Sequence, residues 1–340
     1  MKPLALAACL LFALPTAASA APGDALYTRP GTVVRVADGA RLNLYCIGSG
    51  SPTVVFDSGW EDWAPAWAVV QPKVAKFTRA CSYDRAGAGF SDAGPMPRTS
   101  VRLADELHDA LHKAGIAGPY VLVGNAFGGD PVRTFAQRYT AEIAGLVLVE
   151  ADASDVEPKA MENADHEGDA KFLVRVRECR DAIAAGKPLP PLPSRPGQPH
   201  RSCAQQFFRG LPEAEWSAEL NAKLLTLART KAAMYDAYIS EMQQMPWDEA
   251  WLQQHRRSLG ARPVRVLTTG NHGVGHLPAR DARDPKHLEY ERQIALAQAH
   301  WLELSSNARQ IFVAKSSEYI EFDRPDAVVA AIREVRDQGR

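Results

Sequence analysis

Short apolar runs alternate with segments of helical spacing along the first half of the chain. Short, nearly continuous apolar runs are typical of strands that are buried on both faces. Strands that alternate with helices predict a mostly parallel central sheet flanked by helices, the α/β class. We expect strands at 32–37, 41–47, 53–56, 80–83, 120–123 and 143–149, and helices at 64–77, at 99–114 behind a Thr99 or Ser100 cap, and in a segment that ends near 139.

The alternation stops at Glu150 and resumes at Val264. Between them, helical patterns near 168–186, 213–243 and 247–258 occur without a convincing strand. We therefore predict a sheet domain formed by 21–150 and 262–340, with a helical cap at 151–261 inserted into it. The later part of the sheet domain is expected to contain strands at 264–269 and 310–314 and helices at 287–304 and 326–336.

The first 20 residues are predicted to be an export signal. Lys2 precedes an apolar run at 4–14, and Ala18-Ser19-Ala20 is a small-residue cleavage site. The run is too short to span a membrane, and no later segment predicts a transmembrane helix. We expect a mature chain that starts near Ala21 and is periplasmic or secreted. In that oxidising compartment, the four remaining cysteines favour disulfides over metal or thiol chemistry.

Charge excludes one class of partner. The formal net charge is -1 and the pI is near 6.8, which argues against an electrostatic nucleic-acid binder. The sequence gives no indication of the oligomeric state.

Residues 124–129, Gly-Asn-Ala-Phe-Gly-Gly, follow an apolar strand and precede a helix. This frame is that of the G-x-S-x-G nucleophile elbow, in which a strained turn holds the central side chain above a sheet. The central residue here is Ala126, which has no oxygen with which to attack. The frame indicates acyl-transfer chemistry, and the residue at its centre argues against the standard mechanism.

Four segments together resemble the α/β-hydrolase superfamily, in particular exported or envelope-associated bacterial hydrolases. They are 44–55 (with Gly48-x-Gly50-Ser51-Pro52), 81–91 (with Tyr83-Asp84-Arg85-Ala86-Gly87), the elbow, and 316–325. The resemblance implies the α/β-hydrolase fold with a variable cap, and it assigns a catalytic position to several residues of this chain.

The resemblance places the nucleophile at Ala126 and the catalytic histidine at Glu318, so both members of the Ser-His pair are replaced. Asn125 also replaces a histidine that usually precedes the nucleophile. Glu150, at the end of the sixth strand, is the first choice for the acid, and Asp152 is the second. A carboxylate at Glu318 repels one at Glu150 unless a proton or a cation lies between them.

The same resemblance implies an oxyanion hole made by the backbone N–H groups of Trp60 and Phe127. Ser58, in the oxyanion loop, is an alternative nucleophile. His272 and His276 lie after the seventh strand, near the usual acid position, but isolated histidines in a polar loop are mostly solvated. We therefore expect no metal and no cofactor.

The resemblance also suggests the cysteine pairing. It places the strand that ends at Cys46 beside the strand that opens at Cys81, which implies a disulfide between them. Cys179 and Cys203 bracket a proline-rich loop of the cap and form the natural second pair. Closing a loop of this size contributes about 3 kcal/mol in the chain-entropy model.

Three functional hypotheses follow. In the first, the chain is a catalytically impaired or non-catalytic protein, derived from an ester hydrolase, that binds an apolar or ester-like small molecule between core and cap. In the second, it is an active hydrolase or lyase that uses Glu318 as a general base with the retained oxyanion hole. In the third, it is an engineered inactive variant of a serine ester hydrolase.

Overall fold

The computed structural model describes residues 24–60, 62–153, 159–190, 202–208, 216–270 and 284–339, with the backbone alone for 159–169. The predicted signal segment, 1–20, lies outside the described residues. The described strands form a single eight-stranded sheet. In spatial order they are β1 (Thr32–Arg35), β2 (Arg41–Ile47), β4 (Ala80–Asp84), β3 (Thr53–Asp57), β5 (Tyr120–Asn125), β6 (Ile143–Val149), β7 (Val264–Thr268) and β8 (Ala308–Phe312).

The sheet is antiparallel at one edge and parallel elsewhere. β1 pairs with β2, and β2 with β4, in antiparallel register, and every later pair is parallel. All residues of the central strands β3, β5, β6 and β7 are buried, as their continuous apolar runs predict. The predicted α/β-hydrolase architecture is confirmed.

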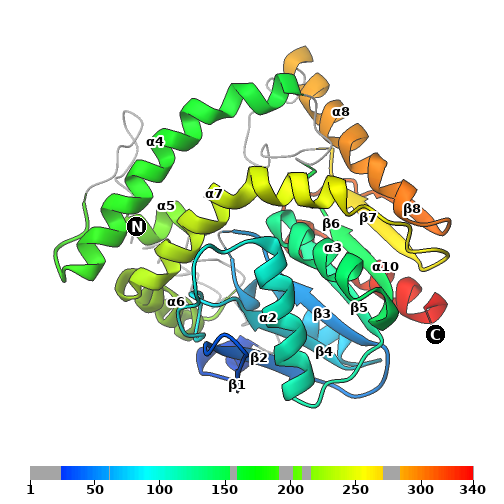
Figure 1. The fold of residues 1–340 in the computed structure, drawn as a ribbon, viewed down its shortest axis with the longest axis horizontal. Helices are drawn as coiled ribbons and strands as arrows, with labels where there is room; N and C mark the ends of the chain where they lie inside the picture. The colour runs from blue at the N-terminus through cyan, green and yellow to red at the C-terminus, as the bar shows by residue number, and fades with distance from the viewer. Residues whose placement is uncertain are drawn as a thin grey trace, which may run out of the picture.

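Helices cover both faces of the sheet (Figure 1). One face carries α2 (Ser100–Lys113), α3 (Gly129–Arg138) and α8 (Pro285–Ala299), whose apolar residues join one core cluster. The opposite face carries α10 (Pro325–Gln338) and the short α1 (Gln71–Val74). Because the parallel strands all end at one edge of the sheet, the loops that follow them gather there and can form a site.

Between β6 and β7 the described residues are helical: α4 (Lys159–Ala184), α5 (Cys203–Phe207), α6 (Ala218–Thr230) and α7 (Ala232–Gln254). These helices lie outside the sheet (Figure 1) and share an apolar cluster with Tyr27, Tyr45 and Trp63 of the sheet domain. Among the described helices, none is both long and apolar enough to cross a bilayer.

Three predicted helices, 64–77, 213–243 and 247–258, were wrong in their bounds. The segment 64–77 forms a 3-10 turn, η2 (Ala64–Trp67), and a separate short α1, because prolines at the start of each piece interrupt the hydrogen-bonding pattern. Conversely, the predicted break between 243 and 247 is absent, since α7 runs through Pro246. The helix predicted over 213–243 is instead divided at Lys231, where α6 ends and α7 begins. Packing of α7 against α4 and α3 supports the helix across the missing N–H.

The structure contains both disulfides that the sequence analysis suggested, Cys46–Cys81 and Cys179–Cys203. Cys46 and Cys81 lie directly opposite each other in the β2–β4 pair, with their Cα atoms 4.1 Å apart. The second disulfide joins α4 to α5 within the cap.

Candidate functional site

The turn after β5 has the geometry of a nucleophile elbow. Ala126 has a φ of 47°, a left-handed conformation that residues other than glycine rarely adopt. The chain then turns back over its own strand, so that a Cβ on Gly124 would lie 2.4 Å from the carbonyl oxygen of Gly128. Only glycine fits at residue 124, and this close crossing holds residue 126 at the tip of the turn.

Five of the residues selected from the sequence line one cavity of about 210 Å³: Trp60, Ala126, Glu150, Asp152 and Glu318. They come from the ends of β3, β5 and β6 and from the segment after β8, so the carboxyl edge of the sheet brings them together. Four further residues complete the lining: Gly59, Asp62, Asn125 and Tyr319.

Glu150 is held firmly beneath the pocket. It directly follows β6, has a φ of 42° and is 1% exposed. Its Oε2 accepts a hydrogen bond from the backbone N–H of Thr269, and its Oε1 accepts one from Gln298 Nε2 at 3.0 Å. The carboxylate thus has dedicated donors, as an orienting acid requires.

Glu318 is half-buried in the short segment between β8 and α9 (Ile320–Asp323). That segment is fixed by two contacts: Ser317 donates to Asp323 through both its backbone N–H and its hydroxyl, and Thr269 donates to the carbonyl of Ser316. Within the described residues, the Glu318 carboxylate makes no hydrogen bond or ion pair of its own. It is therefore available to a ligand.

The two residues of the expected oxyanion hole lie on either side of Ala126. Phe127 follows it in η3 (Ala126–Gly128), and Trp60 lies in the loop after β3, with the two rings stacked 4.9 Å apart. A Cβ on the neighbouring Gly59 would lie 3.3 Å from the Ala126 methyl group, so this loop directly borders the elbow.

The alternative residues are placed differently. Ser58 is buried, and its hydroxyl donates to the carbonyl of Trp63 at 3.0 Å, while the residue is not part of the pocket lining. Asp152 lines the pocket, and its backbone N–H donates to the Ala126 carbonyl at 3.1 Å. His272 and His276 lie outside the described residues.

A buried ion network behind the pocket was not anticipated. Arg85 Nη1 donates to Asp57 at 2.7 Å and to the Ser58 carbonyl at 2.6 Å, and Nη2 donates to the Gly59 carbonyl at 2.7 Å. Arg85 Nε reaches Glu241 of the cap helix α7 at 3.2 Å. Burial raises the pKa of Asp57 and of Glu241, and the Arg85 charge opposes that rise. Arg85 thereby fastens the oxyanion loop to the cap.

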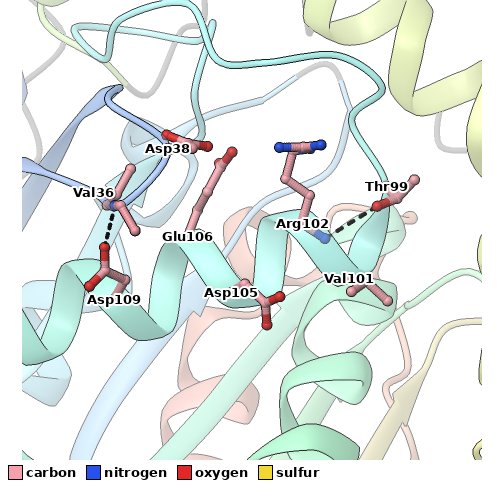
Figure 2. Close-up of a pocket in the computed structure, with 9 residues that line it drawn as sticks. Val36, Asp38, Thr99, Val101, Arg102, Asp105, Glu106 and Asp109 are labelled. Atoms are coloured by element: carbon pink, nitrogen blue, oxygen red, sulfur yellow. Dashed lines mark hydrogen bonds between the residues drawn. The ribbon is translucent and has the colours of Figure 1, made fainter.

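A second cavity, of about 310 Å³, lies between α2 and the turn that joins β1 to β2 (Figure 2). Its acidic side chains already have structural partners: Asp109 accepts a hydrogen bond from the Ala37 N–H at 2.5 Å, and Glu106 is paired with the buried Arg98 at 2.6 Å. None of its lining residues also lines the pocket around Ala126. The pocket around Ala126 is therefore the candidate site, although it is the smaller of the two.

Comparison with known proteins agrees with this geometry. A family model described as the alpha/beta hydrolase fold matches residues 52–264. YbdG, an uncharacterized protein of Bacillus subtilis, is 34% identical over 128 residues, or 37% of this chain and 39% of YbdG. The match therefore spans about two fifths of that relative.

Two other proteins match over most of the chain. An AB hydrolase superfamily protein of Gibberella zeae is 23% identical over 84% of this chain and 86% of its own length. The structure of a thermophilic esterase from Thermogutta terrifontis, with malate bound, matches with a TM-score of 0.54 at 20% identity, covering 91% of this chain and 99% of the esterase chain. At this identity the structural likeness shows the fold alone.

Proposed function

The chain belongs to the alpha/beta hydrolase fold family, and from this premise we propose that its pocket binds a small molecule without forming an acyl-enzyme. The elbow carries the proposal, because the backbone holds residue 126 as it would hold a nucleophile, at a φ of 47°, and the side chain is a methyl group. Covalent acyl transfer needs a nucleophilic atom with an adjacent base. Ala126 supplies no such atom.

The lining suggests the class of ligand. Four acidic residues line the pocket, Asp62, Glu150, Asp152 and Glu318, and within the described residues the Glu318 carboxylate makes no hydrogen bond or ion pair. The rings of Trp60 and Tyr319 add apolar walls that also favour a cation. We infer that the ligand is a small apolar or ester-like molecule that carries an ammonium group or an N–H donor.

Calorimetric titration with benzyltrimethylammonium and with benzoate, which are similar in size and opposite in charge, tests this. We expect the cation to bind more tightly, and Glu318→Gln to weaken its binding about tenfold, or ~1.4 kcal/mol. Glu303→Gln removes an exposed carboxylate elsewhere and is the matched control. Benzoate binding as tightly as the cation would rule the proposal out.

The absence of covalent chemistry at residue 126 has its own test. A fluorophosphonate probe should leave the peptide that contains Ala126 unlabelled. Labelling of Ser58 instead would reveal a relocated nucleophile and contradict a purely binding function.

One observation favours a second function, catalysis with Glu318 as a general base. Glu318 lines the same pocket as Ala126 and has no described partner, so its carboxylate can accept a proton from water or from a substrate. The N–H groups of Trp60 and Phe127 would then stabilise an oxyanion. Turnover of short acyl esters by the unmodified chain, with loss of turnover in Glu318→Gln, would favour this function over simple binding.

The double variant Ala126→Ser, Glu318→His tests whether only the Ser-His pair was lost or whether the rest of the pocket has diverged as well. Glu150 already has the donors that hold an orienting acid, so the variant rebuilds a complete triad on an existing frame. Restored ester hydrolysis would indicate recent loss or engineering of the Ser-His pair. Continued inactivity would indicate that the rest of the pocket has diverged as well.

We also propose that the chain is exported to the periplasm or secreted. The proposal is supported by the signal-like residues 1–20 and by two pairs of cysteines positioned to form disulfides. Expression of the full chain, followed by cell fractionation and mass spectrometry, should recover a mature protein that begins near Ala21. An intact Met1 in the cytoplasmic fraction would exclude export.

A further inference from the structure

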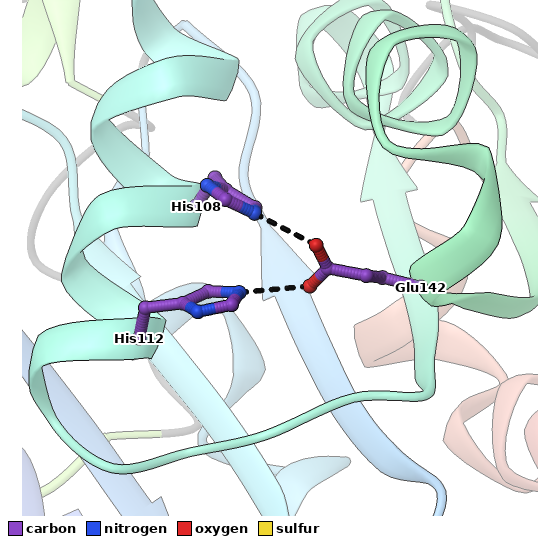
Figure 3. Close-up of side chains that lie close together, drawn as sticks. All are labelled: His108, His112 and Glu142. Atoms are coloured by element: carbon purple, nitrogen blue, oxygen red, sulfur yellow. Dashed lines mark hydrogen bonds and ion pairs between the residues drawn. The ribbon is translucent and has the colours of Figure 1, made fainter.

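Two histidines and a glutamate meet on the surface of the sheet domain, away from the pocket (Figure 3). His108 and His112 are four residues apart in α2 and therefore lie on one face of the helix. Glu142, in the short turn η4 (Thr140–Glu142) before β6, points between them. His108 Nε2 lies 2.9 Å from one of its carboxylate oxygens, and His112 Nε2 lies 2.8 Å from the other.

This donor set suits a borderline first-row metal ion. Two imidazole nitrogens and a carboxylate oxygen are ligands of Zn²⁺, whereas Mg²⁺ and Ca²⁺ prefer oxygen ligands alone. The candidate ligand atoms lie within 4.8 Å of one another. Metal–ligand bonds of about 2.0–2.1 Å in a tetrahedral site put ligand atoms roughly 3.3 Å apart, so small side-chain rotations suffice.

The surroundings hold the ligands in place. The His108 ring stacks on Tyr139 with centroids 3.7 Å apart and an interplanar angle of 4°, and the Tyr139 hydroxyl donates to Asp105. The backbone N–H of Glu142 donates to the Tyr139 carbonyl at 2.9 Å.

Access from solvent is retained. The side chains of His108, His112 and Glu142 are 22%, 48% and 30% exposed, so an ion can enter and water can supply a fourth ligand. We propose that His108, His112 and Glu142 form a Zn²⁺ site that fastens α2 to the start of β6. This inference departs from the expectation, drawn from the sequence, of no metal.

The position of the cluster assigns it a structural role. β5 and β6 are parallel, Ala126 follows the end of β5, and Glu142 precedes the start of β6. The two sites therefore lie at opposite edges of the sheet. Zn²⁺ bound at the cluster would stabilise the fold, because an ion that binds only the folded state shifts the folding equilibrium, and it would not take part in chemistry at the pocket.

The test begins with the full chain freed of metal by dialysis against a chelator. Titration with Zn²⁺ alone should show one tightly bound Zn²⁺ ion per chain. The variant His108→Gln, His112→Gln should bind that ion at least tenfold more weakly. His300→Gln is the matched control, because His300 is an exposed histidine beside a carboxylate, Glu303, at a different place. The proposal fails if the double variant binds Zn²⁺ as the parent does, or if the parent binds none.

A second pair of histidines provides a decisive comparison. The variant His272→Gln, His276→Gln removes the only other His-x-x-x-His pair in the sequence. We expect it to bind the one Zn²⁺ ion as tightly as the parent does. Loss of zinc binding in that variant, with retention in the His108, His112 variant, would overturn the assignment.

Thermal unfolding gives a readout that is independent of the titration. Zn²⁺ should raise the Tm of the parent, while Mg²⁺ at the same concentration should not. Glu142→Gln retains the size of the side chain but removes its charge, and should lose most of the zinc-dependent shift. Circular dichroism establishes that each variant is folded before zinc is added. An equal shift in the parent and in Glu142→Gln would exclude Glu142 as a ligand.

Discussion

At the scale of single residues, Ala126 is one of three described residues other than glycine that have a positive φ, with Glu150 and Lys315. A left-handed conformation costs a residue other than glycine roughly 1–2 kcal/mol, and strain of this kind gathers at functional sites. The crossing of Gly124 over Gly128 enforces that conformation, whatever side chain residue 126 carries. The elbow therefore has a strained backbone at a residue whose side chain is only a methyl group.

Replacing Ala126 with glycine should therefore stabilise the protein. Glycine adopts positive φ without steric cost, and the gain should exceed the extra entropy of the unfolded chain, for a net of about 1 kcal/mol. Thermal unfolding of Ala126→Gly should show a higher Tm than the parent. Ala222→Gly, at an exposed position inside α6, should instead lower the Tm, since glycine disfavours helix interiors. A lower Tm for both variants would show that the elbow is not strained.

At the scale of elements, Arg85, which directly follows β4, links the sheet to the cap through a buried ion network. It faces two buried carboxylates, Asp57 at the end of β3 and Glu241 in α7. Within the described residues, removal of the arginine leaves both buried acids without an ion-pair partner, whereas neutralising Glu241 leaves a balanced Arg85–Asp57 pair. The cost of the two changes should therefore be very unequal.

Arg85→Met should destabilise the protein by about 3–5 kcal/mol, the range for breaking a buried ion pair. Glu241→Gln should cost less than about 1 kcal/mol, because the amide oxygen still accepts from the guanidinium. Urea unfolding measures both. Arg41→Met, which breaks the exposed pair with Asp92, should change the stability little, because solvent screens an exposed ion pair, and it is the control. If Arg85→Met cost no more than Arg41→Met, the Arg85 ion network would not stabilise the protein.

The cap helix α7 also docks through a carboxyl that makes stability depend on pH. Asp248 is buried and accepts a hydrogen bond from the backbone N–H of Ser100 at 2.8 Å. Burial raises the pKa of Asp248 to about 7, although the hydrogen bond from the backbone N–H of Ser100 opposes the rise. A carboxyl whose pKa is raised on folding contributes stability that is complete below its ordinary pKa, near 4, and is lost as the pH rises through 7.

Asp248→Asn should remove this dependence. The Tm of the variant, measured relative to the parent, should increase between pH 5 and pH 8, since only the parent must ionise a buried acid. A relative gain on the order of 1 kcal/mol would appear as about 2 °C. The same relative Tm at both pH values would mean that Asp248 does not titrate in this range.

The sequence predicted the elements of the sheet better than those of the cap. Strands such as 143–149 are buried on both faces, so their apolar runs are unambiguous, and that one begins and ends where expected. The continuity of α7 across Pro246 depends on tertiary packing, which a local pattern does not contain. Ala126 and Glu318 were recognised through family motifs, but Glu241 reaches Arg85 across 156 residues, and no local signal marks such a pair.

The histidine cluster illustrates the same limit in a different way. His108 and His112 lie four residues apart within the predicted helix 99–114, so the spacing was visible in the sequence. The third ligand, Glu142, arrives only because α2 packs beside the turn before β6. A pair of histidines on a helix becomes a candidate metal site only when the fold supplies that partner.

At the scale of the whole molecule, the two disulfides act on different parts of the fold. Cys46–Cys81 staples neighbouring strands near the antiparallel edge of the sheet, whereas Cys179–Cys203 closes a loop within the cap. The sheet supplies the strand ends that form the pocket, while the cap helices α4 to α7 lie between β6 and β7 in the chain. Loss of one disulfide should therefore differ in consequence from loss of the other.

Peptide mapping without reductant should recover Cys46 linked to Cys81 and Cys179 linked to Cys203, and four free thiols would contradict both pairs. Cys179→Ser, Cys203→Ser should cost about 3 kcal/mol in the chain-entropy model and should chiefly increase proteolysis within the cap. Cys46→Ser, Cys81→Ser should lower the midpoint of global unfolding, because it acts on the sheet on which the pocket is built. If the cap variant lowered that midpoint as much as the sheet variant, the cap would have to be regarded as part of the same cooperative unit as the sheet.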